Sequence, residues 1–144
     1  MNIKKISRKG HFLFVLMSIF FSYSSFAQSI DKQKLFDSLI VNKWKTEKVK
    51  VGNEFLKLDK DQLESSLVIL NDHTAQNFSN GGEESGKWEL DAANMKLTIG
   101  FGHLLKIKPI VLNIIILEKN KFVFSVSDEE SENVTTFECI ADQN

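Results

Sequence analysis

The chain of 144 residues contains one cysteine, one proline and three histidines, and this scarcity excludes several kinds of protein. Cys139 has no second cysteine to pair with, so no intramolecular disulfide can form and stability must come from a packed core. No His-x-x-x-His or Cys-x-x-Cys spacing is present, so the sequence predicts no metal site. No cationic neighbour or base stands beside Cys139 to activate its thiol. We therefore expect a non-enzymatic protein without catalytic residues, metal or cofactor.

The first 27 residues have the pattern of a secretory signal peptide. A basic start precedes an almost wholly apolar run from His11 to Phe21. Ser25 and Ala27 then place small residues three and one positions before Gln28, where a signal peptidase cuts. A membrane anchor is the alternative, but it needs about 20 apolar residues, and this run breaks early into serines. We expect cleavage before Gln28 and export to the periplasm or beyond the cell.

The segment 28–144 has the size of one domain. The leader holds four of the 18 basic residues and none of the 19 acidic ones, which leaves 14 against 19 and a formal charge of −5. Nucleic acid is a poor partner for such a chain, because phosphate binding needs clustered Lys and Arg. No cysteine stands at the cleavage site to carry a lipid, and no transmembrane segment is expected in the mature chain.

A short helix is predicted at the start of the mature chain, from Ser29 to Val41. Its large apolar residues recur at spacings that suit one helical face, and Ser29 is a suitable N-cap. These apolar residues are Ile30, Leu35, Phe36, Leu39 and Ile40.

After Asn42 the sequence changes to short segments rich in β-branched and aromatic residues, which is typical of an all-β domain. Residues that favour turns separate these segments, among them Gly52-Asn53, Asn71-Asp72, Asn80-Gly81-Gly82 and Lys119-Asn120. The predicted strands are Trp44–Val51, Glu54–Leu58, Ser65–Asn71, Ala75–Ser79, Gly86–Leu90, Lys96–Phe101, Leu104–Leu117, Lys121–Ser127 and Val134–Ile140. Because the connections are short, sequential strands should pair antiparallel, which favours a closed up-and-down barrel over a sandwich.

Two strands have informative patterns. Lys121–Ser127 alternates, with Phe122, Phe124 and Val126 on one face, which should point inward. Every residue from Ile110 to Leu117 except Asn113 is apolar, so this run predicts burial on both sides. The N-terminal helix is the nearest cover, and a dimer or protein partner is the other candidate.

Three short motifs, Asn42-Lys43-Trp44-Lys45, Leu67 to Thr74 and Gly86-Lys87-Trp88-Glu89-Leu90, together resemble the landmarks of lipocalins and of the small lipocalin-like proteins that Bacteroidetes export. Asn42-Lys43-Trp44-Lys45 is similar to the Gly-x-Trp start of the first strand, although Asn stands in place of Gly. The second landmark, an apolar strand that enters an Asp-Gly-Thr turn, is matched by Leu67 to Thr74 with His73 in place of Gly. Asn and His tolerate positive φ better than most residues. Gly86-Lys87-Trp88-Glu89-Leu90 resembles the third landmark, a Gly-Lys/Thr-Trp strand midway along the chain.

The resemblance implies an all-β fold: an antiparallel up-and-down barrel of eight strands, here possibly nine segments, with a short N-terminal helix. It also implies that Trp44 closes one end. Trp44 and Trp88 are interpreted as structural anchors, with stacking on a ligand as the alternative. The leading hypothesis for function is an exported binding protein that holds a small apolar or amphipathic molecule. Its candidate ligand-binding residues, all predicted to point inward, are Phe101, Leu112, Ile114, Phe122 and Phe124.

The alternative function is a protein-interaction module, an envelope factor or secreted inhibitor whose barrel is filled by side chains. Its support is the apolar run from Ile110 to Leu117, since large apolar patches mark partner surfaces. The other chemistry-bearing residues have ordinary interpretations. His73 and His103 are expected to be turn or surface histidines, and Cys139 a buried free thiol. Gly100 to Gly102 reads as a bend in the barrel, and the acidic segment 128–132 as a solvated hairpin tip.

Overall fold

The structure is a computed structural model that describes residues 30–79, 81–102, 108–127 and 133–142. The predicted signal peptide, His103 and the acidic segment 128–132 lie outside the described residues. Within the described part, no helix is both long and apolar enough to span a lipid bilayer.

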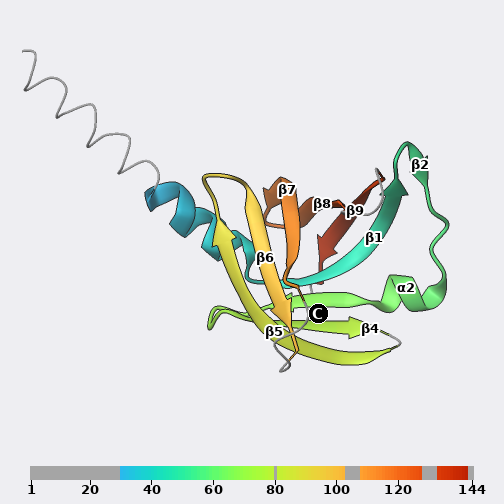
Figure 1. The fold of residues 1–144 in the computed structure, drawn as a ribbon, viewed down its shortest axis with the longest axis horizontal. Coiled ribbons are helices and arrows are strands. Elements are labelled where there is room, and N and C mark those ends of the chain that lie inside the picture. Colours follow the sequence, from blue (N-terminus) through green and yellow to red (C-terminus); the bar gives the residue numbers. More distant parts are fainter. Residues whose placement is uncertain (1–29, 80, 103–107, 128–132, 143–144) are drawn as a thin grey trace, which may run out of the picture.

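The described residues form nine antiparallel strands, and eight of them close into a barrel (Figure 1). Each barrel strand pairs with the next one in the chain, and β1 also pairs with β9, which closes the sheet. The remaining strand, β2, adds two residues to one end of β1. The strands are β1 (Lys43–Val51), β2 (Glu54–Phe55), β3 (Ser66–Ile69), β4 (Thr74–Ser79), β5 (Gly82–Asp91), β6 (Lys96–Phe101), β7 (Ile110–Glu118), β8 (Lys121–Ser127) and β9 (Val134–Ala141). The predicted up-and-down barrel is confirmed.

The helix of residues 30–40 lies across the end of the barrel where β5 ends and β6 begins (Figure 1). Gln33 fastens it there: its side-chain NH₂ donates to the carbonyl of Leu90 at 2.8 Å, and its side-chain oxygen accepts from the Ala92 amide at 3.0 Å. Ile40, at the end of the helix, is wholly buried in the core. The predicted helix is confirmed, but its apolar face is narrower than expected, because Ile30 and Leu35 are exposed.

The connection from β1 to β3 is longer than the sequence analysis expected. The predicted strand Glu54–Leu58 shortens to β2, and a helix that was not predicted follows, α2 (Lys60–Glu64). Asp59 begins α2 with a capping box: its carboxylate accepts from the Gln62 amide, and the Gln62 side chain accepts from the Asp59 amide. The spacing of Asp59 and Gln62 is the signal that was overlooked.

Of the two covers considered for the outer face of β7, the N-terminal helix is wrong, and a dimer or protein partner stays a prediction. The helix covers one end of the barrel, and the outward side chains Val111 and Ile115 are 42% and 53% exposed. The strand also begins at Ile110 rather than Leu104; residues 104–107 lie outside the described part. The closed barrel explains why only one face of β7 is buried. The inward side chains pack inside the barrel, whereas the outward side chains face solvent.

The end of the barrel beneath the helix is densely packed. Trp44 is 1% exposed, and its indole N–H donates to the carbonyl of Ile40 at 2.9 Å, which links the first strand to the helix. Trp88 is also buried, and its indole N–H donates to the carbonyl of Leu70 at 2.9 Å. Both tryptophans are thus buried and hydrogen-bonded to neighbouring segments, and their role as anchors stays a prediction.

Candidate functional site

A cavity of about 260 Å³ lies inside the barrel, in the half away from the N-terminal helix. Its position follows from the strand ends that border it: Ser66 begins β3, Phe101 ends β6 and Ile110 begins β7. Fourteen described residues line it, and most are apolar: Trp44, Thr46, Ser65, Ser66, Leu67, Asn77, Ile99, Phe101, Ile110, Leu112, Phe124, Val126, Phe137 and Cys139. Its volume is just below the roughly 300–1,000 Å³ typical of small-molecule sites.

Trp44 and Phe124 line the floor of the cavity, and Phe122 packs between them in the core. Trp44 contacts Phe122 with ring centroids 5.4 Å apart, and Phe122 contacts Phe124 at 4.8 Å. Phe124 stacks on Phe137 at 5.1 Å, so a continuous row of rings runs from the closed end to the cavity wall. Aromatic pairs at these separations stabilise their own arrangement. The floor is therefore a rigid surface against which a ligand could pack.

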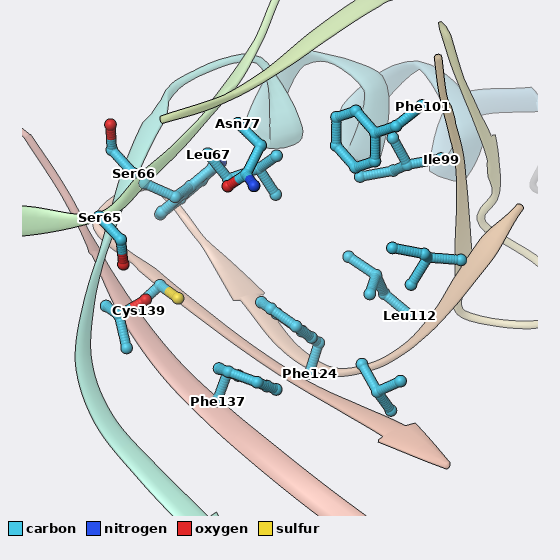
Figure 2. Close-up of a pocket in the computed structure, with 14 residues that line it drawn as sticks. Ser65, Ser66, Leu67, Asn77, Ile99, Phe101, Leu112, Phe124, Phe137 and Cys139 are labelled. Carbon is cyan, nitrogen blue, oxygen red and sulfur yellow. The ribbon is translucent and has the colours of Figure 1, made fainter. Parts of the chain in front are cut away.

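The walls differ in chemistry, as Figure 2 shows. Phe101, Leu112 and Phe124 form an apolar wall from β6, β7 and β8. On the other side of the cavity, polar atoms come from Ser65, the C-cap residue of α2, and from Asn77 of β4. No charged side chain lies among the described residues that line the cavity. The site is thus suited to an uncharged molecule with one polar side.

Cys139 lines the cavity as a buried free thiol, which confirms the sequence prediction. Burial raises the pKa of Cys139 to about 11, and a hydrogen bond with the Thr46 side chain opposes this shift only in part. The thiol is therefore protonated at neutral pH and behaves as a small apolar group.

The five predicted ligand-binding residues divide into two groups. Phe101, Leu112 and Phe124 do line the cavity. Ile114 and Phe122 do not: both are buried in the packed core nearer the closed end, and Phe122 is 0% exposed. Their inward direction was right, but inward side chains near the closed end fill the barrel and leave no space.

The polar wall was missed by the sequence analysis. In β4, Ala75 is buried inside the barrel, so the two-residue period also turns Asn77 inward. In β3, Leu67 faces the same space. The sequence of β4 offered no signal, because it lacks the apolar alternation that would identify its inward face.

The other end of the barrel has a second feature, built on the turn between β3 and β4. His73 adopts φ 62°, a left-handed conformation that favours Gly, and its ring stacks on Trp88 with centroids 4.6 Å apart. Asp72 accepts from the Thr74 amide at 2.9 Å, and hydrogen bonds from Thr74 lower the pKa of Asp72. His73 is exposed, as predicted, but it contributes to packing over Trp88.

Ion pairs connect the start of β1 with the residue that follows β9. The Asp142 carboxylate lies 2.7 Å from the Lys43 ammonium and 3.2 Å from that of Lys45, and its side chain is 7% exposed. Lys43 and then Lys45 lower the pKa of Asp142. This cluster fastens the strand pair that closes the barrel, at the end opposite the cavity.

In the ranges described, no group of three or more His, Cys, Asp and Glu side chains gathers where a metal ion could bind. Comparison with models of known protein families gives no match, and neither does comparison with curated proteins. The closed eight-stranded antiparallel barrel is compatible with a lipocalin-like fold. The barrel and its cavity are therefore the features that bear on function.

Proposed function

We propose that this protein is an exported, non-enzymatic binding protein that holds a small apolar or amphipathic molecule inside its barrel. The observation that carries the proposal is the cavity of about 260 Å³, walled by Phe101, Leu112 and Phe124. The cavity is partly open to solvent at the end of the barrel away from the N-terminal helix, so a small molecule can enter it. An eight-stranded barrel is just wide enough to hold one small ligand.

Fluorescence titration with N-phenyl-1-naphthylamine, an uncharged apolar probe, tests this proposal. Wild-type protein should enhance the probe's emission and saturate at one molecule per chain. Ile110→Trp should weaken binding at least about fivefold, equivalent to roughly 1 kcal/mol, because the larger ring enters the cavity. Val111→Trp is the matched control: the neighbouring residue of β7 is equally exposed, at 42% against 41%, but is outside the cavity.

The titration has two outcomes against the proposal. Absence of saturable binding to the wild-type protein would be one. Equal weakening by Ile110→Trp and Val111→Trp would be the other, because it would place the probe on the outer surface.

A second candidate function is a protein-interaction module, favoured by the exposed apolar side chains Val111 and Ile115 on the outer face of β7. Exposed apolar surface of this kind is typical of partner sites. A photoreactive group in place of Asn113, which lies between them, should crosslink to a specific protein in the exporting compartment. Crosslinking to nothing in a strictly monomeric protein contradicts this candidate.

A further inference from the structure

The side chain of Asn77 is the strongest indication of what the cavity binds. It points into the cavity (Figure 2), and its amide makes no hydrogen bond with any other described residue. Asn77 is partly buried, so its amide is in contact with the solvent of the cavity. A molecule that displaces this solvent has to replace the hydrogen bonds that water makes to the amide, or affinity is lost. Leu67 and the aromatic rings of the lining cannot do so.

The orientation of Asn77 is fixed by the sheet. Asn77 pairs with Leu67 on β3 and with Glu84 on β5, so neighbours on both sides hold its backbone. Gln76, the preceding residue, faces outward and its amide donates to Glu83 at 3.4 Å. A one-residue change of register would exchange the two amides between the faces. Asn77 is thus held toward the interior.

The other polar groups around the cavity are already engaged or point elsewhere. The Ser65 hydroxyl donates to the carbonyl of Gln62 at 2.6 Å. The Thr46 side chain interacts with the thiol of Cys139, whose pKa it lowers. The Ser66 hydroxyl points away from the cavity in Figure 2. Asn77 is therefore the group in the described cavity wall that remains available to a polar atom of a ligand.

The chemistry of Asn limits the polar group that it can recognise. Its NH₂ donates and its carbonyl oxygen accepts, so the best complement is a neutral group that does both, such as a hydroxyl. A carboxylate would have to leave water without an opposite charge, because no cationic residue lines the described cavity, and Glu84, which pairs with Asn77 on the same face of the sheet, would repel it. The volume of about 260 Å³ admits only a short molecule.

We propose that the ligand class is a short, uncharged amphipathic molecule with a hydroxyl-type head, whose head bonds Asn77 and whose apolar part lies against Phe101, Phe124 and Phe137. This inference rests on the proposed function and adds to it the polarity and the orientation of the ligand. It makes Asn77 the residue that determines specificity.

Displacement of N-phenyl-1-naphthylamine by three probes of similar length tests the inference: 1-octanol, 1-fluorooctane and octanoate at pH 8. Wild-type protein should bind 1-octanol about tenfold more tightly than 1-fluorooctane, since one buried hydrogen bond is worth roughly 1 kcal/mol or slightly more. Octanoate should be at least about tenfold weaker than 1-octanol, because its charge is uncompensated. In Asn77→Leu the preference for 1-octanol over 1-fluorooctane should fall to within about twofold.

Gln76→Leu is the matched control, because it removes the same kind of amide from the outer face of the same strand. It should leave the preference unchanged. A second measurement does not depend on the variant folding: the side-chain amide signal of Asn77 in a nitrogen-15 spectrum of wild-type protein should shift with 1-octanol and not with 1-fluorooctane.

The outcomes separate this inference from the proposed function. If the wild-type protein binds no probe, including the naphthylamine, the proposed function fails. If the probes bind without preference, if octanoate equals 1-octanol, or if Asn77→Leu keeps the preference, binding stands and the role of Asn77 is overturned. An Asn77 signal that responds to both octyl compounds alike also overturns it.

Discussion

Replacement of Trp44 by Ala tests whether this residue closes and stabilises the barrel. The Trp44 side chain is 1% exposed, and a tryptophan buries about 150–250 Å². At about 25 cal/mol per Å² the ring contributes roughly 4–6 kcal/mol, of which Ala retains a small part. Measured Trp→Ala substitutions in cores cost about 3–5 kcal/mol. We expect a loss of about 4 kcal/mol, which includes the hydrogen bond to the Ile40 carbonyl.

Urea unfolding followed by far-ultraviolet circular dichroism measures this loss without relying on tryptophan emission. A domain of this size has a free energy of unfolding of roughly 5–15 kcal/mol, so a loss of this size is a large part of the total. The melting temperature of Trp44→Ala should fall by about 10–20 °C. Trp44→Phe keeps a ring but loses the indole N–H, and should cost about 1–2 kcal/mol. A Trp44→Ala protein within about 1 kcal/mol of wild type that no longer binds the naphthylamine would refute the reasoning and make Trp44 a ligand contact instead.

Three further predictions concern the close packing at Gly86, the buried thiol of Cys139 and the ion pairs of Asp142. Gly86→Ala should lower the free energy of unfolding by about 2–3 kcal/mol, because the new Cβ would meet the backbone carbonyl of Gly100. Gly100→Ala is the control and should lose no stability, because its new Cβ meets no atom within 4 Å. Equal urea midpoints for the two variants would contradict this prediction. Because burial raises the pKa of Cys139 to about 11, an aromatic disulfide reagent should label the thiol at pH 8 only after unfolding, and rapid labelling of the folded protein would show that it is accessible. Lys43 lowers the pKa of Asp142 below its usual 3.8. The ionised carboxylate therefore stabilises the fold above pH 3.8, and this stabilisation is lost as the pH falls through the pKa of the folded state. In urea titrations the free energy of unfolding of Asp142→Asn should fall less than that of wild type between pH 5 and pH about 2.

Alternation and turn chemistry were enough to predict most of the barrel. The bounds of β6 and β8 agree with the sequence prediction, because both strands alternate cleanly between turn residues. The N-terminal helix was also predicted, since its apolar residues recur on one face. What failed was the cover of β7: apolar residues on both faces of a strand indicate a low preference for solvent, but they do not identify which element, if any, packs on the outer face.

The cavity could be predicted only in part, because it depends on how much volume the inward side chains leave. Phe124 and Phe122 have the same inward direction in β8, yet one borders the cavity and the other fills the core. Their difference comes from depth along the barrel, which requires the register of β8 with its neighbours. Asn77 was hidden by its polar strand, where no apolar alternation indicated which face was inward.

A crystal structure of the protein purified from its own host is the most direct test of the central claim that the barrel interior is a binding site. We predict electron density for a small non-protein molecule between Phe124 and the polar wall, with a polar atom within hydrogen-bond distance of Asn77. A barrel whose side chains close the cavity completely, with no molecule inside, would contradict the account.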